Sequence, residues 1–259
     1  MGNNTIDHDI DYKQFYDRAG SSTGWDFSEI EKRIKVIGKK WDYLRIVRRY
    51  INRETVLLDV GTGGGEVLLK VAGYVKKAYG IDCSKSMIRR AKKNLFNSNL
   101  KNVEFALSDA KKIPFPNNYF DVVVCRHSNF YPSEVFRVMK PDGIFITQQV
   151  DERDKENIKK IFGRGQSFGE KPGSLMKKYI KELELSGFKI LKTDTYDATE
   201  YYKMDDFVSL LERAPIIQDF DATKDEKFLK EIEKKYGTEE GIMTNSFRFL
   251  IVCQKPHKI

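Results

Sequence analysis

The stretch T-V-L-L-D-V-G-T-G-G-G-E, residues 55–66, decides the fold predicted for this chain. Its first part, Val56–Val60, is a short apolar run with two β-branched residues, which is typical of a strand buried on both faces. Glycines follow at alternate positions, and residues 67–71 begin a helical pattern. A strand, a glycine turn and a helix bring backbone N–H groups and a helix N-terminus to a bound cofactor. The stretch therefore predicts a cofactor site in an α/β protein.

The spacing of the glycines separates two classes of cofactor. A dinucleotide-binding turn has glycine at its first, third and sixth positions, whereas the sixth position here is Glu66. The pattern present is Asp59-x-Gly61-Thr62-Gly63-x-Gly65, which resembles motif I of class I S-adenosylmethionine (SAM)-dependent methyltransferases. SAM carries an ammonium and a sulfonium group, so a carboxylate beside the turn is electrostatically favourable. A tight glycine turn in another kind of α/β protein is the alternative.

A second acid follows the next predicted strand, Val75–Ile81. Asp82 stands 23 residues after Asp59, close to the spacing of an acid that binds the two ribose hydroxyls of a nucleotide. The phrase G-I-D-C-S-K-S-M, residues 80–87, is similar to the same methyltransferase family. This resemblance implies that Cys83 lies beside the cofactor and that Met87 packs on its adenine or ribose. Met87 could equally belong to the core.

A third acid follows the predicted strand Val103–Leu107. The resemblance implies that Asp109 accepts a hydrogen bond from the adenine amino group and that Ala110 donates its backbone N–H to a ring nitrogen. A helix cap or turn cap is the alternative role for Asp109. The whole stretch D-A-x-x-I-P-F-P-x-x-x-F-D-V-V-V, residues 109–124, is similar to the region between the third and fourth strands of the family.

The fourth predicted strand, Tyr119–Cys125, ends in Arg126 and His127, where the family places the transferable methyl group. We expect His127 to be the candidate general base and Arg126 to orient an anionic or carbonyl acceptor or to hold the cofactor. Both could instead be loop residues near the cofactor. The segment has neither the N-P-P-Y pattern of base-amine methylation nor the Pro-Cys pair of cytosine carbon-5 methylation.

The order of elements predicts a doubly wound, mostly parallel, seven-stranded Rossmann-like sheet with an antiparallel last strand and a cap insertion. We expect three regions: an N-terminal cap and packing helix (1–50), a SAM-binding core (51–196 and 244–259) and the insertion (197–243). One amphipathic helix is predicted over Ile30–Tyr50, a sixth strand over Phe188–Tyr196 and a seventh over Asn245–Gln254.

Several aromatic and polar residues outside the core are candidates for binding the acceptor. Residues 163–173 form a glycine-rich loop that could be a substrate gate or an exposed connector. Tyr201 and Tyr202 of the insertion could stack on the acceptor or form the small core of the cap. The full set of candidate substrate-binding residues is Trp25, Arg164, Gln166, Phe168, Tyr201 and Tyr202.

The composition indicates the cellular compartment and the kinds of partner to expect. The chain has 259 residues and a formal net charge of +8. Three cysteines without a C-x-x-C pair and a polar, acidic N-terminus favour a cytoplasmic protein with reduced thiols. No metal-ligand spacing and no membrane-length apolar run is present. We therefore expect SAM as the only cofactor, with no metal and no membrane partner.

The acceptor is the least determined part of the prediction. The basic excess and the aromatic residues favour RNA, although lysine-rich, solvated helix faces explain the same charge. The loop and the insertion also resemble small ribosomal-RNA methyltransferases of antibiotic resistance, including the evernimicin-resistance type. The alternatives are a small-molecule methyltransferase of the quinone or natural-product kind and a SAM-binding module without catalysis.

Overall fold

The computed structural model of the chain describes residue 30 and residues 32–257. Trp25, a candidate substrate-binding residue, therefore falls outside the described residues. The described elements, in chain order, are β1 (Lys35–Ile37), α3 (Tyr43–Val47), β2 (Val56–Val60), α4 (Glu66–Ala72), β3 (Lys77–Asp82), α5 (Lys85–Phe96), β4 (Val103–Leu107), β5 (Phe120–Arg126), α6 (Pro132–Val138), β6 (Met139–Val150), α7 (Glu156–Phe162), α8 (Ser174–Leu185), β7 (Lys189–Tyr202), α9 (Met204–Arg213), α10 (Glu226–Tyr236), β8 (Gly237–Thr238) and β9 (Gly241–Gln254).

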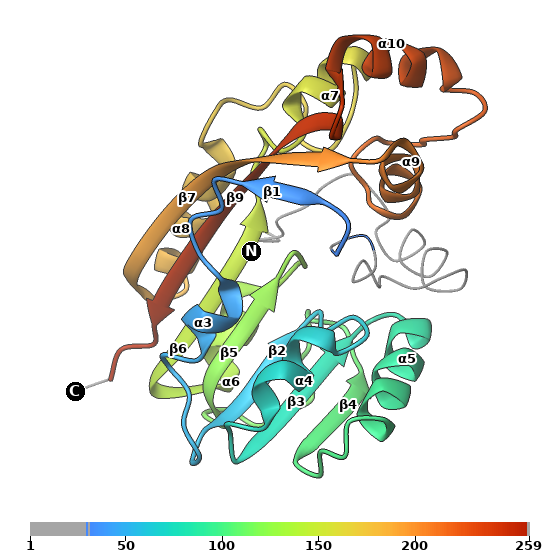
Figure 1. The fold of residues 1–259 in the computed structure, drawn as a ribbon. Helices are drawn as coiled ribbons and strands as arrows, with labels where there is room; N and C mark the ends of the chain where they lie inside the picture. The colour runs from blue at the N-terminus through green and yellow to red at the C-terminus, as the bar shows by residue number, and fades with distance from the viewer. Residues whose placement is uncertain (1–29, 31, 258–259) are drawn as a thin grey trace.

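All of the described strands belong to one sheet with the order β1-β7-β9-β6-β5-β2-β3-β4, and β8 pairs with β9 (Figure 1). The five strands from β4 to β6 are parallel, and β9 runs antiparallel to both of its long neighbours, β6 and β7. The chain order reverses between β2 and β5, and the crevice at such a reversal is where open α/β sheets bind ligands. This architecture confirms the predicted doubly wound, mostly parallel fold, but the described part of the sheet has nine strands rather than seven, because the short strands β1 and β8 add to its antiparallel part.

Helices cover both faces of the sheet and make two apolar cores. On one face, α3, α4 and α5 pack on side chains such as Leu57, Val124 and Ile146. On the other face, α6 and α8 pack on side chains such as Leu58 and Phe145. Because neighbouring side chains along a strand alternate between faces, the continuous apolar run Val56–Val60 serves both cores.

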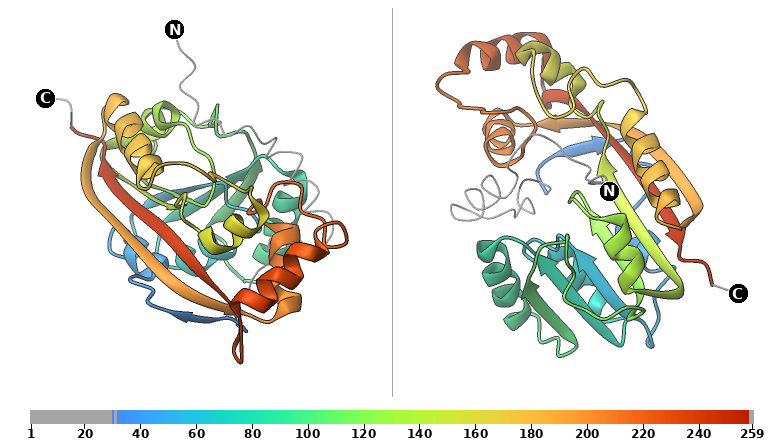
Figure 2. Two further views of the ribbon diagram at one scale, coloured as in Figure 1. Left: turned by 90° about the horizontal axis from the view of Figure 1, so that it is seen from above. Right: turned by 180° about the vertical axis from the view of Figure 1, so that it is seen from behind.

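Strands β7 and β9 extend beyond the parallel strands and carry a third apolar cluster (Figure 2). They pair with each other from Lys189 and Gln254 to Tyr202 and Ile242. Helices α7, α9 and α10 pack around the far part of this hairpin through buried residues that include Phe162, Phe207, Leu211 and Ile232. This hairpin with its three helices is called the β7–β9 extension below.

Three predicted elements need correction. The helix over Ile30–Tyr50 is wrong: the chain forms the edge strand β1, which pairs with β7, and then only the five-residue helix α3. The apolar residues Val36 and Ile37 of β1 are exposed, so the helical spacing did not reflect one buried face. The sixth and seventh strands are longer than predicted, so the segment between them is 203–240 rather than the predicted insertion 197–243.

Candidate functional site

The glycine turn after β2 has a backbone that requires glycine. Gly61, Gly63 and Gly65 all have positive φ angles, +71°, +56° and +77°. A Cβ on Gly61 would overlap the Ser128 hydroxyl, and one on Gly65 would lie 2.5 Å from Phe105 Cζ. The turn is therefore pressed against neighbouring strand ends and leaves its own face without side chains, as a cofactor-binding turn must.

Asp82 joins this turn to the end of β3. Its carboxylate accepts hydrogen bonds from the backbone N–H groups of Gly63 and Ser84, both at 2.9 Å. Ser84 in turn caps α5 by accepting from the Met87 N–H at 3.4 Å. The carboxylate that is expected to bind ribose is thus placed against the glycine turn by two local hydrogen bonds.

Asp59 lies at the end of β2 and is only 4% exposed. Its carboxylate accepts a hydrogen bond from the Thr62 hydroxyl at 2.8 Å. Burial, with a smaller contribution from the nearby charge of Asp82, raises the pKa of Asp59 to about 7 against the opposing effects of the Thr62 hydrogen bond and the Arg126 cation. Asp59 therefore titrates near neutral pH, and an added cation beside it would favour the ionised form.

Asp109 lies just beyond β4, next to the strand that carries Asp82. Leu107 is the register partner of Asp82, and the Ser108 N–H donates to the Asp82 carbonyl at 2.9 Å. Asp109 is exposed, and its carboxylate accepts a hydrogen bond from the Lys111 N–H at 2.8 Å. The structure thus brings the three acids to the ends of three adjacent strands.

The remaining predicted cofactor residues divide between the surface and the core. Cys83 and Ala110 are half-buried beside Asp82 and Asp109. Met87 is 2% exposed and belongs to the buried core, which matches the alternative role considered for it. Thr62 is buried and bonded to Asp59, so it orients that acid.

Arg126 is the last residue of β5 and lies on the same sheet face as Asp59. The pairing of Asp59 with Val124 and of Arg126 with Gln148 gives these residues a common face. The buried Nε of Arg126 has no hydrogen-bond partner among the described residues, and the guanidinium lies 5.9 Å from the Tyr43 ring centroid. A buried donor without an acceptor is costly, so Arg126 is prepared to bind an anionic or carbonyl group.

His127 is held as a neutral imidazole. The indole of Trp41 can only donate, and it donates to Gln148 Oε1 at 2.8 Å, which turns the Gln148 amide nitrogen toward His127 Nε2 at 2.9 Å. His127 Nε2 must then accept, so the proton of the ring lies on Nδ1. Burial lowers the pKa of His127 well below 6.5, and the cations Arg126, Arg248 and Lys39 lower it further. A base of such low pKa whose acceptor nitrogen is already occupied is poorly suited to proton abstraction.

A small hollow of about 40 Å³ lies at the ends of β5 and β6. Its lining is mainly polar and comprises His127, Ser128, Asn129, Gln149, Val150, Asp151, Gln166, Ser167, Leu175 and Tyr179. Gln166, a candidate for binding substrate, lines this hollow together with His127.

The loop 163–173 is fixed to its surroundings along its length. Lys159 donates to the carbonyl of Gln166 at 2.9 Å, and Glu152 accepts from the Gly173 N–H. Arg164, a candidate for binding substrate, is committed to Asp225 at 2.8 Å, whereas Phe168 is 41% exposed. The first part of the loop is therefore bound to α7 and to the start of α10, both in the β7–β9 extension, and its last residue is bound to Glu152, just after β6.

Tyr201 and Tyr202 are strand residues of β7 and lie on opposite faces of the sheet. Tyr202 is buried and donates its hydroxyl to Glu200 at 2.6 Å, so it contributes to the core of the extension. Tyr201 is half-buried, with Lys35 5.8 Å from its ring centroid. No contact in the described chain brings either ring to His127.

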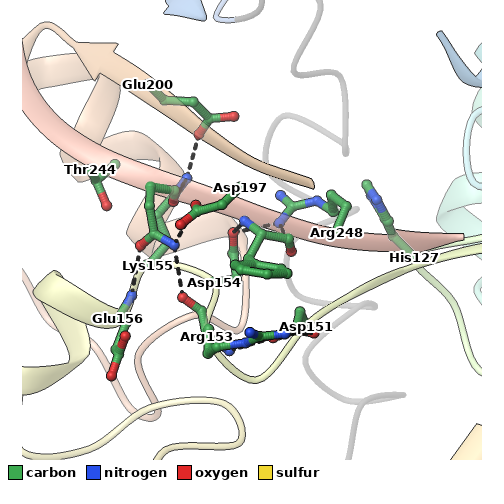
Figure 3. Close-up of polar contacts among 12 residues, drawn as sticks. His127, Asp151, Arg153, Asp154, Lys155, Glu156, Asp197, Glu200, Thr244 and Arg248 are labelled. Carbon is green, nitrogen blue, oxygen red and sulfur yellow. Dashed lines mark hydrogen bonds and ion pairs between the residues drawn. The ribbon is translucent and has the colours of Figure 1, made fainter. Parts of the chain in front are cut away.

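The structure also shows buried ion pairs that the sequence analysis missed. Arg248 pairs with Asp154 at 2.5 Å, and Lys155 pairs with Glu200 (Figure 3). Burial alone would raise the pKa of Glu200, but the cations Lys155 and Arg248 lower it to about 2. Lys155 and Glu200 are 45 residues apart in the chain, and Asp154 and Arg248 are 94 residues apart. No local sequence motif predicts such pairs.

The described residues contain neither a cluster of metal-binding side chains nor a helix that could span a membrane. Within the described residues, no group of three or more His, Cys, Asp or Glu side chains is arranged to hold a metal ion. The helices described, searched over the same part of the chain, are all too short or too polar to cross a membrane.

Comparison with known sequences places the fold and the glycine turn in context. Residues 51–204 match the family described as a methyltransferase domain. The chain is 34% identical over 97 residues to the uncharacterized methyltransferase YcgJ of Bacillus subtilis (strain 168), covering 35% of this chain and 38% of that protein. It is 32% identical over 136 residues to the ubiquinone/menaquinone biosynthesis C-methyltransferase UbiE of Rickettsia bellii (strain OSU 85-389), covering 47% and 54%. The match thus spans about half the length of these relatives or less.

Comparison with solved structures supports the fold. A putative methyltransferase from Bacillus halodurans C-125 has a TM-score of 0.63 at 20% identity, covering 83% of this chain and 99% of that one. The [4+2]-cyclase SpnF has a TM-score of 0.56 at 22% identity, covering 83% and 81%. Because a structure described as a cyclase shares the fold, the fold alone does not determine the reaction.

The residues present fit the cofactor that the family implies, S-adenosylmethionine. The bare glycine turn, the strand-end carboxylates and the unpartnered Arg126 Nε suit a ligand with cationic, hydroxyl and carboxylate groups. These findings agree with the predicted cofactor. The relatives' names give no support to the predicted ribosomal-RNA acceptor or to the antibiotic-resistance type.

Proposed function

Because the chain belongs to the methyltransferase domain family, we propose that it transfers a methyl group from SAM to a small-molecule acceptor. The observation that carries this proposal is the Asp82 carboxylate, which is bonded to the bare glycine turn at the point where the strand order reverses. That arrangement is suited to a nucleoside with free ribose hydroxyls. The aligned relative that is named for a reaction is a quinone-biosynthesis C-methyltransferase, which favours a small acceptor over RNA.

Each part of the cofactor has a corresponding residue in this site. Asp82 would accept hydrogen bonds from the ribose hydroxyls, and Asp59 would face the ammonium group. Asp109 and the Ala110 N–H would bind the adenine edge. Bound SAM supplies an activated methyl group, which a nucleophile displaces in line, so the protein mainly aligns the reactants and excludes water.

On the acceptor side, we propose that Arg126 orients the acceptor and that His127 holds the neighbouring polar side chains in place. Arg126 has a buried donor that no described residue satisfies. His127 fills the end of β5 as a neutral ring bonded to Gln148 and lines the hollow together with Gln149 and Gln166. The acceptor would therefore be selected by hydrogen bonds to a carbonyl, hydroxyl or carboxylate group.

We further propose that the β7–β9 extension closes the acceptor side, with residues 203–240 in the role predicted for the cap insertion. Arg164 ties the loop 163–173 to α10 through Asp225, and Lys159 ties the same loop to α7. The proposal keeps the predicted division of the chain into residues 1–50, the core and the insertion. The insertion now begins after Tyr202, where β7 ends, and stops before Gly241, where β9 begins.

The experiment is transfer of labelled methyl groups from SAM to two pools, a metabolite extract containing lipid-soluble quinols and deproteinised total RNA. We expect label in a small organic product and none in RNA. The matched control is Asp82→Asn, which keeps the size of the side chain and removes its charge. Label in RNA would refute the small-molecule acceptor, and SAM binding without transfer to either pool would refute catalysis.

A further inference from the structure

A basic groove lies outside the proposed cofactor and acceptor sites, between the segment before β2 and the start of β7. It encloses about 560 Å³ and is lined by Lys39, Lys40, Trp41, Asp42, Arg45, Ile46, Arg49, Lys192 and Asp194. The two sides are joined by the Lys40–Asp194 ion pair at 2.5 Å. Its volume lies in the range of small-molecule sites.

The cations of this groove outnumber its acids, and the acids are already engaged. Asp42 caps α3 by accepting from the Leu44 and Arg45 N–H groups at 2.8 and 3.2 Å. Asp194 lies between Lys40 and Lys192, the second at 3.6 Å, and these partners lower its pKa against the opposing effect of burial. Both carboxylates therefore already have partners, and the five cations of the groove exceed its two acids.

Three of the cations, Lys39, Arg45 and Arg49, form no ion pair with any other residue in the described chain. Arg45 lies in α3 and Arg49 lies two residues after its end at Val47, and both line the same side of the groove. Like charges around a concave surface repel each other and focus a positive potential into it. An anion with more than one negative charge would relieve this repulsion.

The chemistry of the lining also specifies the ligand. Arginine guanidinium groups match phosphate oxygens in a two-pronged geometry, and lysines add point charges. Trp41 and Ile46 contribute an apolar wall on which an organic group can pack. We propose that this groove binds the phosphate or pyrophosphate group of a small soluble molecule. The concave shape favours such a ligand over the flat surface of a phospholipid bilayer.

The groove lies next to the proposed acceptor site, and the side chain of Trp41 connects the two. Trp41 lines the groove and donates its indole N–H to Gln148, whose amide contacts His127. Lys39 is close enough to His127 to help lower its pKa. The phosphate-bearing ligand would therefore lie beside the acceptor site and be separated from it by the Trp41 ring.

The test is calorimetric titration of the full chain with inorganic pyrophosphate, using the double variant Arg45→Gln/Arg49→Gln. We expect saturable binding by the unchanged protein and at least about tenfold weaker binding by the variant. The control, Arg89→Gln/Lys92→Gln, removes the same charge from exposed positions on α5 and should change the affinity less than about twofold. Equal weakening by both variants, or no saturable binding, would overturn the proposal.

Two further measurements distinguish ligand binding in the groove from SAM binding and from membrane binding. SAM affinity should be the same in the unchanged protein and both variants, so a failed methyltransferase assay does not bear on the groove. Flotation with phosphatidylglycerol vesicles distinguishes the source of the phosphate. Vesicle binding that depends on Arg45 and Arg49, without binding of pyrophosphate, would overturn the proposal of a soluble ligand.

Discussion

The glycine turn at the end of β2 and the base of the β7–β9 extension both bury charged side chains, but they hold them differently. At the glycine turn, the carboxylates of Asp59 and Asp82 accept hydrogen bonds from a hydroxyl group and from backbone N–H groups. At the extension, Asp154 and Glu200 are paired with cations from distant parts of the chain. The first arrangement holds carboxylates with neutral donors, whereas the second pairs opposite charges inside the protein.

The largest expected effect tests the structural side of this comparison. Asp154→Ala should leave the Arg248 cation buried without a partner and lower the free energy of unfolding by about 3–5 kcal/mol, measured by urea denaturation. The side chains of Asp154 and Arg248 are only 5% and 14% exposed. Glu240→Gln, which breaks the exposed pair with Lys35, is the control and should cost less than about 1 kcal/mol. Similar costs for the two variants would contradict the assigned difference.

The second prediction concerns the shape of the glycine turn. Gly61→Ala should weaken SAM binding and destabilise the fold by about 1–3 kcal/mol, because the new Cβ overlaps Ser128 and the φ angle is +71°. Adding the substitution Ser128→Gly should recover the loss of stability and of SAM affinity that the overlap causes. It should not recover the loss that the positive φ angle causes. Calorimetry and thermal unfolding of the single and double variants separate the two contributions. No recovery in the double variant would mean that the overlap is unimportant.

The third prediction concerns the acid at the end of β3. Asp82→Ala should weaken SAM binding by about 1–3 kcal/mol, the cost of losing a hydrogen-bonded charged group. Asp121→Ala is a useful comparison, since Asp121 accepts from the Val56 N–H at the opposite end of the sheet. It should leave SAM affinity within about twofold of the unchanged protein. Unchanged affinity in Asp82→Ala would remove this residue from the cofactor site.

The fourth prediction is a pH dependence that arises from Asp59. Its pKa in the folded chain is about 7, above the ordinary value of 3.8, because of burial. The folded chain therefore binds more protons than the unfolded chain between about pH 4 and 7, and Asp59 lowers stability as pH rises through that window. Asp59→Asn should remove this slope from denaturation curves collected across the window. A slope that persists in the variant would assign the titration to another group.

Cofactor binding should show the opposite trend with pH. An ammonium group beside Asp59 favours the ionised carboxylate, so SAM affinity should rise by about tenfold between about pH 5.5 and 7.5. The affinity of Asp59→Asn should stay nearly constant over that range. Because the pKa of His127 is well below its ordinary value, His127 should add no titration in this window.

Local sequence predicted the glycine-turn half of the site well. The strand Val103–Leu107 has the predicted bounds, and β2 with its turn and the position of Asp82 lie where the pattern put them. These features depend on short-range rules: apolar runs make strands, and positive φ angles require glycine. The partner surfaces of the turn, Ser128 and Phe105, were missed because they are distant in the chain.

The other half of the fold was predicted less well for physical reasons. The segment Ile30–Tyr50 has helical spacing, but pairing of Lys35–Ile37 with β7 makes it an edge strand. Glu200, Tyr201 and Tyr202 look like the polar start of an insertion, yet β9 continues to pair with them. Strand pairing between distant segments overrides local preference, so it cannot be deduced from one segment alone.

The sequence by itself determined the α/β class, the glycine turn and its acids, and the kind of cofactor, because each depends on residues that are near one another in the chain. Tertiary structure decided which charges stay free. It buried Asp59, left the Nε of Arg126 without a hydrogen-bond partner among the described residues, and paired Arg248 with Asp154, which is 94 residues away in the chain. It also gathered Lys39, Arg45 and Lys192 around one groove. The availability of a charge depends on its neighbours in space, and those neighbours are set by long-range packing.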